Sequence, residues 1–266
     1  MIKVHFLKEI NLKNVVRLGS TGFEVKKVQE WINLWRFVDP TWKHIVSVDG
    51  DFGPQTDQII RAFQEKFKLG VDGVVGASTY HKLVEPMIKA FTKINIQDYR
   101  ERIVAYATQH LNNQPKELYS SNQGPWVRAY MDGNEGRDWA WCMGFVQTVL
   151  DQSFTGTNQM FTMIMPHTYS CDVVGFFGRQ KNKLIAHEIL LNNPSAIQKG
   201  DVFLVRRTPM DWTHTGIVAK VDGKMIHTIE GNTNDEGSRE GFEVCQRIRN
   251  LDRNTLDIFK TDIAAV

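Results

Sequence analysis

Four residues of this sequence have types and an order that suit acyl transfer. Cys142 stands in WAWCMGFVQTVL, His214 opens HTGIVAKV, and TIEGNTND contains Glu230 and Asn232. A thiol, an imidazole that takes its proton and a polar group that orients the imidazole are the working parts of cysteine acyl-transfer enzymes. The candidate catalytic residues are therefore Cys142, His214, Glu230 and Asn232.

Each of these residues also has an ordinary structural interpretation. A single cysteine on an amphipathic helix is more often an inert core residue than a nucleophile. A histidine near the start of a strand often has a structural role. The same holds for a glutamate and an asparagine beside a glycine. The joint order is what favours a shared site, because chance seldom places all of these groups on a helix, a strand and the next strand.

The segments around the four residues predict the elements that position them. Apolar residues at helical spacing predict a helix that begins near Cys142, where unpaired backbone N–H groups and the helix dipole stabilise a thiolate. Residues 214–221 and 225–230 flank Asp222-Gly223, a dipeptide typical of hairpin turns. Antiparallel pairing around that turn places Glu230 near the start of the His214 strand.

The remaining periodicity predicts an α+β fold with an antiparallel sheet. A helical pattern covers 103–111, and a stretch rich in Gly, Pro, Asn and Asp at 114–138 predicts a loop. Further strands are predicted at 201–205, 240–248 and 257–263. Helices that precede strands along one chain indicate an α+β architecture.

A short internal repeat marks the N-terminal part of the chain. Residues 48–56 (VDGDFGPQT) and 71–79 (VDGVVGAST) share the pattern V-D-G-x-x-G-x-x-T, which predicts a turn followed by a helix start. The preceding segment GFEVKKVQEWINLW has its apolar residues on one helical face. We expect a small helical domain at 1–92 and a second domain at 93–266.

Three motifs occur in order in this N-terminal part: G-x-x-V-x-x-x-Q, then D-G-x-F-G-x-x-T, then F-Q. The residues that form them are Gly22, Val25, Gln29, Asp49, Gly50, Phe52, Gly53, Thr56, Phe63 and Gln64. The arrangement, over roughly residues 15–88, resembles the three-helix family of peptidoglycan-binding domains. The resemblance implies binding to bacterial peptidoglycan.

Four motifs of the C-terminal part also occur in a recognisable order. They are W-C-x-x-F-V at 141–146, K-G-D-V at 199–202, H-T-G-I-V at 214–218 and E-G-N-T-N at 230–234. Over about 98–263, the chain resembles the CHAP family of cysteine, histidine-dependent amidohydrolases and peptidases.

This second resemblance implies a papain-like scaffold that needs no cofactor. It makes Cys142 the nucleophile, His214 the general base and then acid, and Glu230 the partner that orients the imidazole. Asn232 would hold the ring or polarise the site, and the division of labour between the two polar residues stays open. The related NlpC/P60 family shares this chemistry, but a small residue usually follows its cysteine, whereas Met143 does so here.

Two groups of residues in the sequence have side chains that can bind metal ions. Asp132, Asn134 and Asp138 resemble the start of a calcium loop, but the twelfth position holds Met143 instead of a glutamate. His167 and Cys171 have the one-turn spacing of a zinc pair, without a second pair to complete the site. We expect no metal. Tryptophans flank the cysteine and histidine motifs and would either line a groove or belong to the core: Trp126, Trp139, Trp141 and Trp212.

Composition excludes several classes of protein. The net charge of +2 lacks the basic excess of a nucleic-acid-binding domain, and no apolar run is long enough to cross a membrane. The three cysteines are too widely spaced for a disulfide framework. The N-terminal segment has no signal-peptide pattern, so we expect a protein that is made in the cytoplasm and reaches the cell wall after release or delivery. We also expect a monomer.

The sequence thus predicts a modular peptidoglycan hydrolase of the phage or prophage endolysin kind. Whether it cuts the muramoyl-alanine amide or a peptide bond of the stem or cross-bridge is left open. The alternatives are a delivered antibacterial effector with the same chemistry, a non-catalytic wall-binding protein, and a cysteine enzyme that acts on proteins or other amides.

Overall fold

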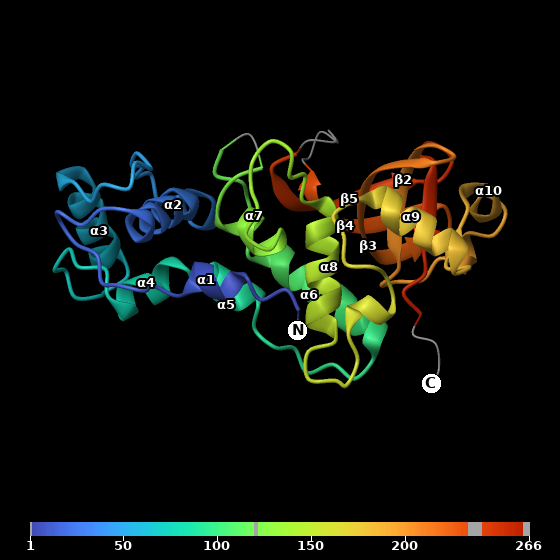
Figure 1. Ribbon diagram of the computed structural model, residues 1–266, viewed down its shortest axis with the longest axis horizontal. Helices are drawn as coiled ribbons and strands as arrows, with labels where there is room; N and C mark the ends of the chain where they lie inside the picture. Colours follow the sequence, from blue (N-terminus) through green and yellow to red (C-terminus); the bar gives the residue numbers. More distant parts are fainter. Residues whose placement is uncertain (1, 120–121, 234–240, 263–266) are drawn as a thin grey trace.

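A computed structural model describes residues 2–119, 122–233 and 241–262 of the protein. The molecule is elongated, with the N-terminal helices at one end and a β-sheet at the other (Figure 1). Three helices, α6 (Tyr99–Asn112), α7 (Pro125–Tyr130) and α8 (Cys142–Ser153), lie between the two ends. Helices and a purely antiparallel sheet in one chain confirm the predicted α+β class.

The N-terminal end is helical, as the periodicity predicted. Its central helix is α2, whose apolar face, including Val25, Val28 and Ile32, is buried. The helices of this end are α1 (Phe6–Ile10), α2 (Phe23–Val38), α3 (Pro54–Lys66), α4 (Ala77–Leu83) and α5 (Glu85–Ala90).

The repeated V-D-G turns are held in the same way at both copies. Gln29 on α2 donates to Asp49 Oδ1 at 2.8 Å and accepts from the Gly50 N–H at 2.9 Å. Gln64 on α3 makes the equivalent bonds to Asp72 and to the Gly73 N–H, both at 2.9 Å. The repeat is therefore a helix glutamine that clamps the following Asp-Gly turn.

One predicted loop contains a helix. The prediction that 114–138 is entirely loop was wrong, because α7 (Pro125–Tyr130) lies within it. Proline suits the first helical position, Gly124 supplies a positive φ of 111° before it, and Trp126 and Val127 are buried. Burial of these apolar side chains stabilises a helix that composition alone did not indicate.

In the described part of the chain, the sheet has six strands in the order β1-β6-β2-β3-β4-β5, and every neighbouring pair is antiparallel. The predicted hairpin is present, but Asp222 pairs with Met225, so its loop is Gly223-Lys224, one residue later than predicted. The predictions for residues 240 and 263 lie outside the described residues. The strands are β1 (Leu184–Ile185), β2 (Val202–Thr208), β3 (Asp211–Asp222), β4 (Met225–Thr233), β5 (Glu243–Asn250) and β6 (Leu256–Phe259).

Helices cover one face of the sheet, and Cys142 begins one of them. α6, α8 and α9 (Cys171–Gln180) pack on this face, and α8 lies against β3 and β4. On the other face, α10 (His187–Leu190) helps to cover an apolar cluster that includes Phe203, Val218 and Ile258. The N-terminus of α8 is thereby held over the two strands that bear His214 and Glu230.

The two ends of the molecule are joined by buried contacts. Arg128 on α7 pairs with Glu9 of α1 at 2.9 Å and with Glu30 of α2 at 2.6 Å. The backbone N–H groups of Ile2 and Lys3 donate to Asp151 on α8 at 2.8 Å. The division at residue 92 remains a prediction, but the regions on either side of it share one core.

Candidate active site

Cys142 is the first residue of α8, and a buried tryptophan fixes this helix end. The Trp141 indole N–H donates to Glu117 Oε1 at 2.8 Å, and its ring stacks on Tyr130. Cys142 itself is 5% exposed, so its sulfur is almost completely shielded from water. The Met143 backbone N–H hydrogen-bonds to this sulfur, which is the stabilisation expected in the first turn of a helix.

His214 and Glu230 meet across the β3–β4 hairpin. The register pairs Ile217 with Ile229, and His214 Nε2 lies 2.8 Å from Glu230 Oε2. Glu230 occupies Nε2, and the other ring nitrogen, Nδ1, is buried without a hydrogen-bond partner among the described residues. The Cys142 side chain lies close enough to His214 for each to shift the pKa of the other. The hairpin predicted from sequence therefore does bring His214 and Glu230 together.

The thiol and the imidazole each shift the pKa of the other toward its charged form. A hydrogen bond from Cys171 and, against the effect of burial, the hydrogen bond and charge of His214 hold the pKa of Cys142 well below its usual value. Burial alone would lower the pKa of His214, but Cys142 and Glu230 raise it to about 9. A thiolate beside an imidazolium is the activated form of a cysteine nucleophile.

Glu230 is held in place from the next strand. Its carboxylate is fully buried and accepts from Arg249 Nε at 2.7 Å, from Arg249 Nη2 at 2.6 Å and from the Thr228 hydroxyl at 2.5 Å. Burial would raise the pKa of Glu230, but the bonds from His214 and Arg249 lower it to about 2. The carboxylate is therefore ionised at neutral pH and holds a charge beside the imidazole.

Asn232 lies near this group but does not bond to His214 among the described residues. It has a left-handed φ of 55°, is buried, and its Oδ1 has no hydrogen-bond partner in the part of the chain that the structure describes. Gly231 beside it packs so closely on α8 that an added Cβ would lie 2.7 Å from Phe145. Of the two polar candidates, Glu230 is the one that contacts the imidazole.

Three residues of the site were not found from the sequence: Cys171, Thr228 and Arg249. Cys171 begins α9, and sequence spacing had linked it only with His167 as a rejected zinc pair. Arg249 sits on β5 opposite Ile226, which shares a face of β4 with Glu230. The one feature of the sequence that could have indicated Arg249 is its place directly after the strand predicted at 240–248, which follows Glu230 along the chain.

Two of the residues considered for calcium and zinc, Asp132 and His167, belong to a separate bonded cluster. Asp132 Oδ2 binds Lys3 Nζ at 3.0 Å and His167 Nε2 at 2.9 Å, and it accepts from the Tyr169 hydroxyl. The Asn134 side chain donates to the Met131 carbonyl. Among the described residues, no three histidines, cysteines or acids are grouped as they would be around a metal ion.

Most of the flanking tryptophans belong to the core. Trp126, Trp141 and Trp212 are buried, which agrees with the conservative interpretation of their role. Trp139 is half-buried and packs edge-on against Tyr169.

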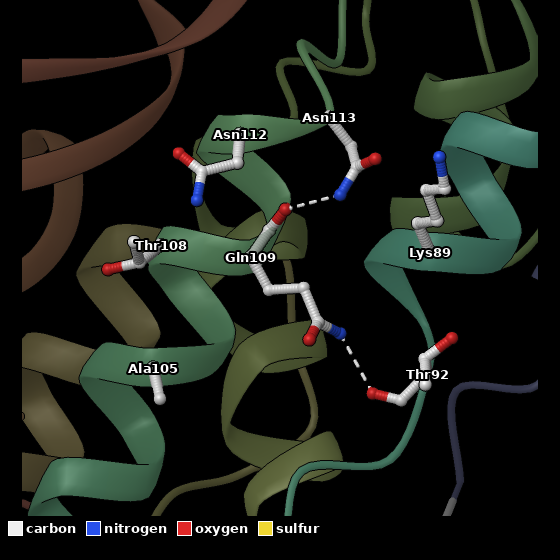
Figure 2. Close-up of a pocket in the computed structure, with 7 residues that line it drawn as sticks. All are labelled: Lys89, Thr92, Ala105, Thr108, Gln109, Asn112 and Asn113. Carbon is white, nitrogen blue, oxygen red and sulfur yellow. Dashed lines mark hydrogen bonds between the residues drawn. The ribbon is translucent and has the colours of Figure 1, made fainter.

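A cavity of about 540 Å³ lies between α5 and α6, away from this site (Figure 2). The Gln109 side chain in it is already bonded to the carbonyl oxygens of Ala90 and Thr92. None of the cavity's lining residues belongs to the group around Cys142. This cavity therefore adds nothing to the candidate active site.

Comparisons with known proteins bear on the N-terminal end. No helix of the described residues is both long and apolar enough to cross a bilayer. No curated protein matches the sequence significantly. One similar solved structure is "The crystal structure of SleB N-terminal domain", 38% identical, with 27% of this chain and 90% of that chain aligned and a TM-score of 0.23.

A family match covers the clamped turns. Residues 21–83 match the family described as "Putative peptidoglycan binding domain". The match includes α2, α3 and α4, together with both V-D-G turns. This chain therefore carries an N-terminal peptidoglycan-binding domain, as its motifs predicted.

Proposed function

We propose that this protein is a peptidoglycan hydrolase that cleaves an amide bond with Cys142 as nucleophile. The observation that carries the proposal is the cluster in which Cys142 begins α8, His214 bonds to Glu230, and Cys142 and His214 lie close enough to shift the pKa of each other. The resemblance to the CHAP family and the attached peptidoglycan-binding domain support the choice of substrate.

The proposed reaction has two stages. The Cys142 thiolate attacks the amide carbonyl, and the N–H groups of the first turn of α8 stabilise the resulting oxyanion. His214 then gives its proton to the leaving amine, which leaves a thioester on the sulfur. Water that gives a proton to His214 hydrolyses this thioester and restores the thiolate.

The peptidoglycan-binding domain supplies local substrate. A domain that holds the wall raises the effective concentration of cleavable amides near Cys142 without any new contact at the scissile bond. An endolysin of a phage or prophage is the proposed setting, and the bond cut is an N-acetylmuramoyl-L-alanine amide or a stem or cross-bridge peptide bond.

Purified sacculi test this proposal. The wild-type protein should clear a sacculus suspension, and Cys142→Ala should lose clearing while it still sediments with the sacculi. Mass spectrometry of the products would identify the bond, because an amidase frees the alanine amine and an endopeptidase frees a stem or cross-bridge amine. Clearing by Cys142→Ala, or none by a folded wild-type protein, would refute the proposal.

A further inference from the structure

A cavity of about 430 Å³ lies where the peptidoglycan-binding domain meets the C-terminal part of the chain. One wall comes from α2, through Asn33 and Arg36, and from residues 45–47, with Gln55 at the start of α3. The other wall is Leu118 and Tyr119, which precede α7. The cavity therefore belongs to both halves of the molecule.

One side of this cavity is built rigidly. The buried Asn33 side chain donates to the Val46 carbonyl at 2.8 Å and accepts from the Val46 N–H at 2.9 Å. These paired bonds fix the segment of residues 45–47 against α2. A binding surface that is already ordered loses little entropy when a ligand arrives.

Arg36 carries the sole charge among the described residues that line this cavity. Within the described chain it forms no ion pair, and its Nε is buried without a hydrogen-bond partner. Its guanidinium lies over the Phe37 ring, 4.6 Å from the centroid, which limits its mobility. A half-buried guanidinium without an acceptor is a docking point for a carboxylate, which it can bind at two points.

The other exposed groups suit a sugar–peptide ligand. Within the described residues, the Ser47 hydroxyl and the Gln55 amide have no protein partner, so both are free to bond to a polar polymer. Tyr119 is 45% exposed and offers an aromatic face beside them. Amides, hydroxyls and an aromatic ring around one cation match a ligand that is partly polar, partly apolar and anionic.

We infer that this cavity binds a muropeptide segment of peptidoglycan, with a stem-peptide carboxylate paired to Arg36. The inference rests on the wall-binding part of the proposed function and is independent of the cysteine chemistry. The cavity is also connected to the start of α8. Glu117, next to Leu118, accepts a hydrogen bond from the indole N–H of Trp141. The segment that borders the bound polymer is thus the one that fixes the start of the Cys142 helix.

The test measures binding by the full chain with Cys142→Ala, so that the probe is not cut. The probe is a soluble disaccharide-tetrapeptide, titrated calorimetrically against this protein and against the same protein with Arg36→Gln. Loss of the charge-assisted bonds should weaken binding about tenfold or more. Arg17→Gln is the matched control, because it removes the same charge from an exposed site of the same domain and should bind unchanged.

Two further probes identify the recognised chemistry. The first probe is the same muropeptide with its carboxylates amidated. Its affinity for the protein that keeps Arg36 should be as low as the affinity of the native muropeptide for Arg36→Gln. The second probe is an oligomer of N-acetylglucosamine, which has no carboxylate. Arg36→Gln should not change the affinity of the protein for this oligomer. Gln55→Ala, at an exposed position, should weaken muropeptide binding without affecting folding.

The outcomes separate this inference from the proposed function. Equal muropeptide affinity with and without Arg36, or equal loss with Arg17→Gln, overturns the inference. If Arg36→Gln unfolds, as thermal melting would reveal, unchanged affinity of Gln55→Ala and of the amidated probe overturns it instead. Sedimentation of Cys142→Ala with sacculi in those cases leaves the wall-binding proposal standing, whereas no sedimentation refutes that proposal.

Discussion

Arg249 binds both carboxylate oxygens of Glu230, with Nε 2.7 Å from Oε1 and Nη2 2.6 Å from Oε2. Since Glu230 in turn bonds to the His214 ring, β5 fixes the orientation of the imidazole through β4. A planar guanidinium can hold a carboxylate at two points, and a lysine ammonium cannot. The geometry of the proposed base therefore depends on a residue that does not touch the sulfur.

Arg249→Lys should lower kcat/KM for sacculus hydrolysis about tenfold or more, because the charge remains while the two-point hold on Glu230 is lost. Sedimentation with sacculi should not change. The rate of amine release from sacculi measures the effect. Arg253→Lys, at an exposed position, is the control, and equal rates for the two variants would contradict a positioning role for Arg249.

Glu230→Gln should make the protein lose activity at a lower alkaline pH than the wild type does. The pKa of His214 is raised to about 9, partly by the Glu230 charge, so the proton for the leaving amine is present below about pH 9 and is lost above it. Without the charge this pKa falls, and the alkaline limb of the rate profile moves to lower pH. A profile of kcat/KM against pH measures the shift, and an unmoved alkaline limb would disprove the assignment.

Cys171→Ala should make Cys142 a weaker acid. The hydrogen bond from Cys171 is the largest influence that holds the pKa of Cys142 below its usual value, so its removal raises that pKa. The rate of alkylation by iodoacetamide, measured against pH, should begin to rise at a higher pH than in the wild type. Cys171→Ser keeps a hydroxyl donor and should shift the curve less, and the opposite order would rule out this role.

Arg128→Met should destabilise the folded protein by about 3–5 kcal/mol, because Glu9 and Glu30 would remain buried without their counter-ion. Urea unfolding measures the loss. Lys89→Met breaks an exposed helical pair with Glu85 and should cost less than about 1 kcal/mol. Similar losses for both variants would mean that the Arg128 contacts contribute little.

Local sequence signals predicted the parts of the site that lie close together in the chain. The helix at Cys142 followed from apolar spacing, and the hairpin that joins His214 to Glu230 followed from a turn dipeptide, with an error of one residue in its loop. The clamped V-D-G turns were visible as a repeat for the same reason. Such features are encoded within a few residues of one another.

The remainder depends on packing between distant segments. Cys171 reaches Cys142 from another helix, and Arg249 reaches Glu230 from another strand, so neither leaves a periodic trace in the sequence. The attachment of Ile2 to Asp151 spans 149 positions, and α7 forms because its apolar residues are buried by other segments. No pattern within a short window encodes such contacts.

The bonds of Arg128 to Glu9 and Glu30 have a further consequence for how such an enzyme would travel over its substrate. When a flexible linker joins a binding domain to a catalytic domain, the catalytic domain can reach many bonds while the binding domain stays at one place on the polymer. Here buried ion pairs hold the peptidoglycan-binding domain against the C-terminal part of the chain, so the protein itself sets the distance between a bound segment of cell wall and the proposed nucleophile Cys142. Each binding event would then bring one short stretch of polymer to the thiol. Cleavage at a new position would require the protein to dissociate from the wall and bind again.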